Sequence, residues 1–319
     1  MKALVLLLAS ALALSVAPAR AGEPRVEDQS KGIALVPPEG FVVSVDSSAE
    51  TLVLIGPRLS GVDARLEVHG RVDGRPPALA LADFERETLQ LDGEETRDDW
   101  SLPRDDDALA GAVLMDRTAQ RKSLRTGVAA TRHGPYLVLL VAEAAPAMFE
   151  QLQGDYEESF RALERLPLEA DWRDEALEVA LHSLPEWLEL QPDKTEAGKN
   201  ALWRWESLDK TLWATLSIEA REPEKDPAEH YDDEEQKLRQ SSGLSDLERR
   251  DQFVSGEKGA RFEATFRGGS TRWEVRVQQG SGDEARMIVV TGICPTSLVE
   301  SDFGAVFQDV FAHLTIDGS

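Results

Sequence analysis

The feature that most constrains the fold of this chain is an internal repeat. Residues 38–43 (PEGFVV) recur as residues 185–190 (PEWLEL), about 147 positions further along the chain. Residues 136–146 (YLVLLVAEAAP) are matched by residues 286–295 (RMIVVTGICP) at nearly the same spacing. Segments that recur in the same order at an almost constant spacing indicate two copies of one domain.

The predicted boundary between the copies is a polar, acidic stretch at residues 167–174. We therefore predict one domain over residues 22–168 and a second over residues 169–319. A single cysteine cannot close an intramolecular disulfide, so each domain has to be stabilised by a packed core.

Alternating apolar and polar residues predict strands in both copies. In residues 211–221, for example, Leu212, Ala214 and Leu216 alternate with polar neighbours, which is the period-two pattern of a half-buried strand. Short turns between such segments favour an antiparallel sheet. The expected strands are 33–36, 51–55, 64–72, 111–117, 124–131 and 136–143 in the first copy, and 177–181, 200–207, 211–221, 260–266, 271–278 and 286–292 in the second.

Two helices are expected in each copy, one in the middle (residues 80–91 and 230–238) and one at the end. Pro146 and Pro295 are expected at the first position of the closing helices, where the missing N–H costs nothing. Phe149, Leu152, Tyr156, Phe160 and Leu163 then form a core-facing stripe on the first of them. The fold class predicted from this order is α+β, with an antiparallel sheet sandwiched between helices in each copy.

The first 21 residues have the pattern of a cleavable signal peptide. Lys2 precedes an apolar run that is too short to span a membrane, and Ala19 to Ala21 supply the small residues that a signal peptidase recognises. No cysteine lies near this site, so a lipoprotein anchor is not expected. We expect a periplasmic or secreted protein with no membrane span after cleavage.

The chain is strongly acidic, with a formal net charge of −24. A surface of this charge repels nucleic-acid phosphates and anionic lipids, which argues against nucleic-acid binding. The same charge favours a basic partner, because opposite charge accelerates encounter.

The layout resembles the PsbP-like superfamily, which includes DcrB-like exported bacterial proteins. The resemblance depends on residues 38–41 and Glu158-Ser159-Phe160 in the first copy and on residues 185–187 in the second. The second copy departs from the pattern, because Val310-Phe311 stands where a Ser-Phe pair would be expected. The resemblance implies an antiparallel sheet between helices and binding, scaffold or chaperone-like roles rather than catalysis, with no catalytic residues to carry over.

Motifs for catalysis, cofactors and metals are missing from the sequence. The five histidines (His69, His133, His182, His230 and His313) do not have metal-ligand spacing. No G-x-S-x-G, G-x-G-x-x-G or G-x-x-x-x-G-K segment occurs. We therefore expect no enzyme activity, no cofactor and no metal site.

Cys294 is the one candidate nucleophile. It precedes Pro295 and hence the expected helix N-terminus, where the dipole lowers a thiol pKa. Its counterpart in the first copy is Ala145, however, which favours a buried small apolar residue. A cysteine hydrolase is therefore the weaker alternative.

Two acidic runs suggest calcium. Asp105 to Asp107 lie in a predicted loop, where they could hold a divalent ion weakly. Asp232 to Glu235 lie on a predicted helix, and consecutive helical residues point in different directions. We interpret the second run as a solvated helix face.

The tryptophans are the most informative residues, and Trp187, Trp203, Trp205, Trp213 and Trp273 all lie in the second copy. Trp203 and Trp205 share one face of a strand, while Trp213 lies on the face opposite the apolar residues of the next strand. Trp213, with Trp203 and Trp205, is the candidate surface for a partner or ligand. The alternative is that a helix covers Trp213 and makes it a core residue.

Together these features predict an exported, non-enzymatic protein that binds another protein or peptide of the cell envelope. The alternative is a periplasmic carrier or sensor of a small apolar ligand or lipid.

Overall fold

The structure is a computed structural model that describes most of the chain. The described residues are 25–29, 32–48, 51–88, 96–100, 102, 111–119, 122–222, 227–280, 285–300 and 302–316. The predicted signal peptide (1–21) and Asp105 to Asp107 lie outside them. Among the described residues, no helix is long and apolar enough to span a bilayer.

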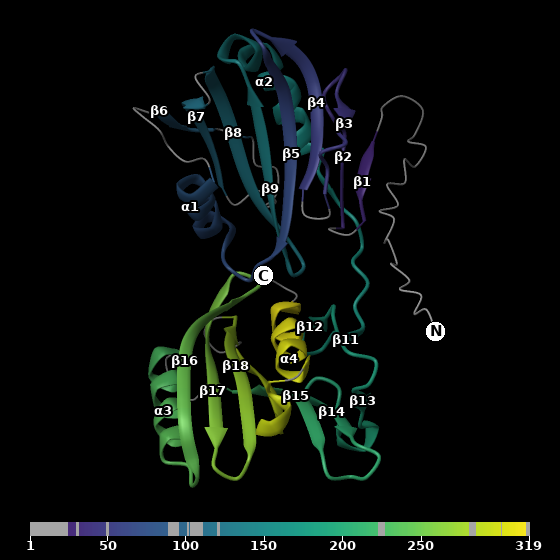
Figure 1. Cartoon of the computed structure of the whole chain (residues 1–319), viewed down its shortest axis with the longest axis vertical. Helices are drawn as coiled ribbons and strands as arrows, with labels where there is room; N and C mark the ends of the chain where they lie inside the picture. Colours follow the sequence, from purple (N-terminus) through teal and green to yellow (C-terminus); the bar gives the residue numbers. More distant parts are fainter. Residues whose placement is uncertain are drawn as a thin grey trace, which may run out of the picture. The chain divides into compact units, whose positions relative to one another are not determined.

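The chain has an α+β fold dominated by antiparallel strands, and it divides into two compact units (Figure 1). The first unit comprises Met1–Gly70, Glu85–Thr131 and Val138–Pro167, and the second comprises Arg71–Phe84, Arg132–Leu137 and Leu168–Ser319. The chain passes into the last segment of the second unit between Pro167 and Leu168.

The first seven-stranded sheet has the strand order β3-β4-β5-β9-β8-β7-β6. Its strands are β3 (Val42–Val43), β4 (Thr51–Leu59), β5 (Val62–Val72), β6 (Thr96–Asp99), β7 (Gly111–Ala119), β8 (Lys122–His133) and β9 (Tyr136–Ala144). A small sheet pairs β1 (Val26–Asp28) and β10 (Glu164–Arg165) with β2 (Ile33–Leu35). The two helices are α1 (Pro77–Thr88) and α2 (Pro146–Arg161).

The second seven-stranded sheet has the order β13-β14-β15-β19-β18-β17-β16, which is the order of the first sheet at equivalent chain positions. Its strands are β13 (Glu189–Leu190), β14 (Asn200–Glu206), β15 (Trp213–Arg221), β16 (Leu244–Val254), β17 (Glu257–Phe266), β18 (Ser270–Gln279) and β19 (Arg286–Pro295). A small sheet again pairs β11 (Trp172–Asp174) and β20 (Leu314–Ile316) with β12 (Val179–Leu181). The helices are α3 (Pro227–Arg239) and α4 (Asp302–Ala312), with short 3-10 turns at Pro192–Lys194 and Thr296–Leu298.

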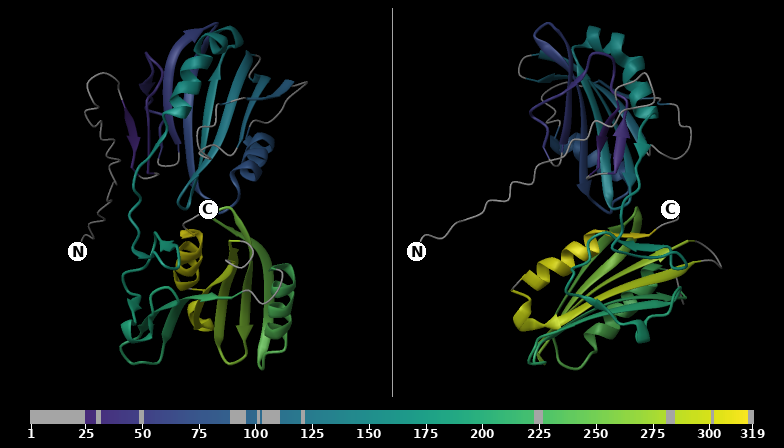
Figure 2. Two further views of the ribbon diagram at one scale, coloured as in Figure 1. Left: turned by 180° about the vertical axis from the view of Figure 1, so that it is seen from behind. Right: turned by 90° about the vertical axis from the view of Figure 1, so that its right-hand side faces the viewer.

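The main core of the second unit lies between one face of the second sheet and α4, the helix drawn in yellow (Figure 2). Phe307 and Val310 of α4 are fully buried there, and Trp273 of β18 packs on Phe307 with ring centroids 5.5 Å apart. The small sheet adds Val179 and Leu314 to the same core. We call this face of the second sheet the inner face, and the opposite face the outer face.

The helix α3 packs against β16 and β17, and its acidic run is part of the contact. Arg249 of β16 donates hydrogen bonds to Asp232 and Glu235, at 2.6 and 3.1 Å. Arg276 of β18 is buried and lies 2.9 Å from Glu234. The interpretation of residues 232–235 as a solvated face was therefore wrong for Glu234 and Glu235, whose side chains are only 12% and 23% exposed, whereas the side chain of Asp232 is 73% exposed.

The arginine that anchors α3 also belongs to a buried network within β18. Arg276 pairs with Glu274, and Arg272 pairs with the same carboxylate. Arg276 also donates to His230 of α3 at 3.2 Å. Glu274 and Arg276 are 1% and 3% exposed, so removal of one partner would leave the other charge in a site that excludes water.

Two sequence-based expectations about the elements were wrong. Pro146 does stand in the first turn of α2, but Pro295 ends β19, and α4 begins only at Asp302 after a 3-10 turn. The long edge strand β16 was not expected, because its residues Leu244–Val254 are mostly polar and carry no clear apolar alternation.

We predict that Arg276→Met lowers the free energy of unfolding by about 3 kcal/mol, because Glu274 then stays buried without its closest partner. The double variant Arg276→Met/Glu274→Leu should recover most of this loss, since it removes both charges. Urea denaturation of the full chain measures both values. A single variant as stable as the unsubstituted chain would contradict a stabilising role for the network.

A second prediction concerns acid. Burial favours the neutral form of Glu234, but the Lys237 ammonium and the Arg276 guanidinium outweigh it and lower the Glu234 pKa. Hydrogen bonds from Arg239 and Arg249 likewise lower the Glu235 pKa. A carboxylate whose pKa is lower in the folded state than in the unfolded state stabilises the fold at pH values above the unfolded-state pKa. This stabilisation is lost as the pH falls through the folded-state pKa.

Thermal unfolding between about pH 6 and pH 3 should therefore show a loss of stability that is smaller in Glu234→Gln. An equal loss in both proteins would show that Glu234 does not contribute.

Candidate functional site

Trp213 begins β15 and lies on the outer face of the second sheet, as the alternation predicted. Its neighbours Ala214, Leu216 and Ile218 are fully buried on the inner face. Trp213 itself is partly exposed, in register with Glu206 of β14. The helix on the outer face, α3, packs instead on β16 and β17.

Trp203 and Trp205 lie on the inner face, opposite Trp213. They are in register with Leu216 and Ala214 of β15, which belong to the core. Trp203 is 1% exposed and packs edge-on against Trp172, with ring centroids 5.0 Å apart. The three candidate tryptophans therefore do not form one surface, and Trp203 is a core residue.

Trp205 belongs to a different group of aromatic side chains, which we call the aromatic patch: Trp187, Trp205 and Phe303. Trp187 comes from the segment before β13, Trp205 from the end of β14 and Phe303 from the first turn of α4. The ring centroid of Phe303 is 4.8 Å from Trp187 and 4.9 Å from Trp205, and the two indoles are 6.1 Å apart. All three are partly exposed at the rim of the core.

The first sheet has no aromatic patch at the equivalent positions. The turns before β3 and β13 are closed by the same hydrogen bond, from Phe41 N to Pro38 O and from Leu188 N to Pro185 O. Val42 pairs with Ile55 in the first sheet, and Glu189 pairs with Arg204 in the second. These two pairs give a residue-by-residue alignment of the two sheets at this edge. By this alignment, Gly40 is equivalent to Trp187 and Gly56 to Trp205.

Packing explains the glycine at position 56. A Cβ on Gly56 would lie 2.3 Å from the ring of Phe41, so the phenyl ring fills that space in the first sheet. In the second sheet the residue equivalent to Phe41 is the smaller Leu188, and the residue equivalent to Gly56 is Trp205 of β14, whose indole extends from that strand. Both Phe41 and Leu188 are buried, so the exchange moves the aromatic ring outward to the rim.

The hairpin that joins β14 to β15, shortly after Trp205 in the chain, presents an exposed leucine. Asp209 accepts hydrogen bonds from the Ser207 hydroxyl at 2.6 Å and from the Thr211 amide at 3.1 Å. These hydrogen bonds hold the pKa of Asp209 below its usual value. They fix the loop in a form in which Leu208 is fully exposed.

The residues with catalytic potential are held in structural contacts. Four of the five histidine rings have contacts of this kind, with Glu67 (His69), the carbonyl of Glu169 (His182), Arg276 (His230) and Asp309 (His313). Within the described residues, no three His, Cys, Asp or Glu side chains are grouped to hold a metal ion. Cys294 is fully buried in β19, and burial raises its pKa to about 11. Because α4 begins only at Asp302, the α-helix N-terminus expected directly after Cys294 is not there.

Sequence reasoning did not single out Trp187 or Phe303 as site residues. The signal for Trp187 was present in the repeat, where a tryptophan stands against the glycine of the first copy. Phe303 had no such signal, because the start of α4 was expected several residues earlier.

Comparison with known proteins gives only distant structural neighbours. No family model matches the chain, and no curated protein matches it. A solved mutant of protein Mog1 is 12% identical, with 46% of this chain and 96% of that chain covered and a TM-score of 0.33. Cyanobacterial PsbP (CyanoP) from Synechocystis sp. PCC 6803 is 12% identical, covering 47% and 97%, with a TM-score of 0.29. The T6SS immunity protein TplEi from Pseudomonas aeruginosa, complexed with "L" peptide, is 10% identical, covering 88% and 99%, with a TM-score of 0.26.

We predict that Cys294 does not react with a thiol reagent in the native protein near pH 8, because its raised pKa leaves a very small thiolate fraction and its side chain is buried. The same reagent should modify one thiol per chain in denaturant, and none in Cys294→Ala. Rapid modification of the native chain would contradict this prediction and support the alternative of a cysteine hydrolase.

Proposed function

We propose that this chain is an exported, non-enzymatic protein of two tandem PsbP-like domains that binds another protein or peptide of the cell envelope. The observation that carries the proposal is the aromatic patch of Trp187, Trp205 and Phe303 at the rim of the second core. The apolar-carrier alternative has no comparable observation in its favour.

The composition and position of the patch support binding to a macromolecule. Large aromatic side chains that stay partly exposed are typical anchors of protein interfaces, because they bury much area with few rotatable bonds. The three rings come from three separate segments, so the packed core holds them in place before a partner arrives. Leu190 on edge strand β13 is 38% exposed and extends the apolar surface along the inner face.

The tandem arrangement is supported by the matching strand orders of the two large sheets and of the two small ones. The elements also follow one another in the same order in both halves, with a helix after the third strand of each large sheet and another after the last. We propose that the first domain is the mainly structural one, since glycines stand where the second domain has Trp187 and Trp205.

The contacts of the titratable groups support binding rather than catalysis. Cys294 is buried with a raised pKa, and the Nδ1 groups of His182 and His313 donate hydrogen bonds to the backbone carbonyls of Glu169 and Asp309. Export is proposed from the signal pattern of residues 1–21 alone.

The proposal is tested by affinity capture from envelope extract with three proteins: the chain from Gly22 onward, its Trp187→Ala variant and its Trp213→Ala variant. Truncation of an anchoring tryptophan typically costs about 2 kcal/mol, or about thirtyfold in affinity. We expect a captured protein that is lost with Trp187→Ala and retained with Trp213→Ala. Trp213 is the matched control, because it is also partly exposed but lies on the outer face.

Circular dichroism and the melting temperature show whether each variant is folded. Loss of capture with Trp213→Ala alone would move the binding surface to the outer face. Absence of any partner for the folded parent chain would contradict the proposed function.

A further inference from the structure

We infer that the aromatic patch recognises a basic peptide segment, with an arginine or lysine side chain of the partner packed on the rings of Trp187, Trp205 and Phe303. This inference rests on the proposed function and adds the chemical class of the partner.

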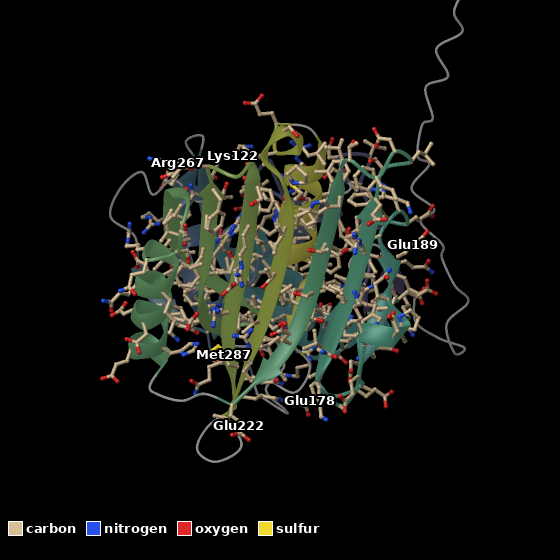
Figure 3. The ribbon with its side chains drawn as sticks, turned by 90° about the horizontal axis from the view of Figure 1, so that it is seen from below. Lys122, Glu178, Glu189, Glu222, Arg267 and Met287 are labelled. Carbon is tan, nitrogen blue, oxygen red and sulfur yellow. The ribbon has the colours of Figure 1, made fainter. Side chains whose placement is uncertain are left out.

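The charge of the segments that build the patch points to a cationic partner. Residues 184–191 and 296–306 contain Glu186, Glu189, Glu300 and Asp302 but no lysine or arginine. Glu186 and Glu300 are exposed. Glu189 is exposed too, but it stands at the edge of the second sheet away from α3 (Figure 3), and its register with Arg204 places it on the outer face, so it does not add to the charge beside the patch.

The cations nearest to the patch in the sequence do not neutralise this charge. Arg204 precedes Trp205 on β14, but it is in register with Glu189 and Thr215 on the outer face, where it forms an ion pair with Glu206. Lys210 lies in the hairpin beside Asp209. An incoming cation therefore finds carboxylates without competing basic side chains on the segments of Trp187 and Phe303.

The geometry of the rings suits a cation. The planes of the three rings meet at 51° to 73°, so none is stacked face to face on another. A guanidinium or ammonium group can pack on the part of these rings that stays exposed, and tryptophan binds cations best of the aromatic residues. The protein already contains one such contact, where the guanidinium of Arg249 lies 5.9 Å from the ring centroid of Phe262.

Other occupants fit the patch less well. A second copy of this chain and an anionic membrane both carry negative charge, and the chain has a net charge of −24. A basic peptide is attracted over the whole approach and can place apolar residues on the exposed side chains of Leu190 and Leu208.

The test is a titration of the full mature chain with short synthetic peptides that carry a fluorophore. The probes are a peptide of alternating arginine and leucine, and peptides in which glutamine or glutamate replaces every arginine. Fluorescence anisotropy at low and at high salt gives the dissociation constants. We expect the arginine peptide to bind at least about tenfold more tightly than the glutamine peptide at low salt, with the difference reduced at high salt.

Two variants locate the site. Trp187→Ala should weaken binding of the arginine peptide about fivefold or more, and Glu186→Gln/Glu300→Gln should weaken it without loss of fold. The matched control is Glu222→Gln/Glu229→Gln, which removes two exposed carboxylates elsewhere in the second unit. Glu222 follows β15 at the end opposite Trp213 (Figure 3).

The outcomes separate this inference from the proposed function. Equal effects of the two double variants, or equal affinity for the arginine and glutamine peptides, would overturn the basic partner. If the envelope partner is still captured through Trp187 in that case, the proposed function stands without the inference. If the captured partner is lost in the Glu186 and Glu300 variant and retained in the control, both are supported.

Discussion

The packing of the inner face of the second sheet against α4 is the interaction on which the rest of this unit depends. Trp203, Trp273 and Phe307 are nearly or fully buried in it, so the sheet and the helix are held in one arrangement. That arrangement fixes the start of α4 next to the end of β14, and so brings Phe303 to Trp205. The positions of the aromatic side chains at the rim of the core are therefore set by the packing at its centre.

The outer face is stabilised in a different way. Beneath α3, a small apolar group that includes Tyr231, Phe262 and Met287 is buried, and ion pairs from Arg249 and Arg276 complete the contact. Buried ion pairs add little net stability but penalise any arrangement in which a partner is missing. We infer that these pairs fix where α3 sits more than how strongly it is held.

The sequence predicts best what depends on apolar periodicity. The strands at the centre of each sheet and the face of Trp213 follow from alternation, because burial on one side imposes a period of two. The edge strand β16 lacks that signal, since solvent and α3 both accept polar residues such as Glu248 and Arg249. The aromatic patch could not be predicted as a group, because Trp187, Trp205 and Phe303 meet only through tertiary packing.

The exchange between Phe41 with Gly56 and Leu188 with Trp205 has a consequence for how such a surface can arise. One corner of the same sheet architecture accepts an aromatic ring from either of two neighbouring strands. The ring of Phe41, which follows the turn, is buried and fills this corner of the first sheet. The ring of Trp205, which lies on the paired strand of the second sheet, stays partly exposed. A few substitutions at that corner are thus enough to turn a rim without exposed aromatic rings into one that can bind a partner. The residues in the interior of the fold need not change.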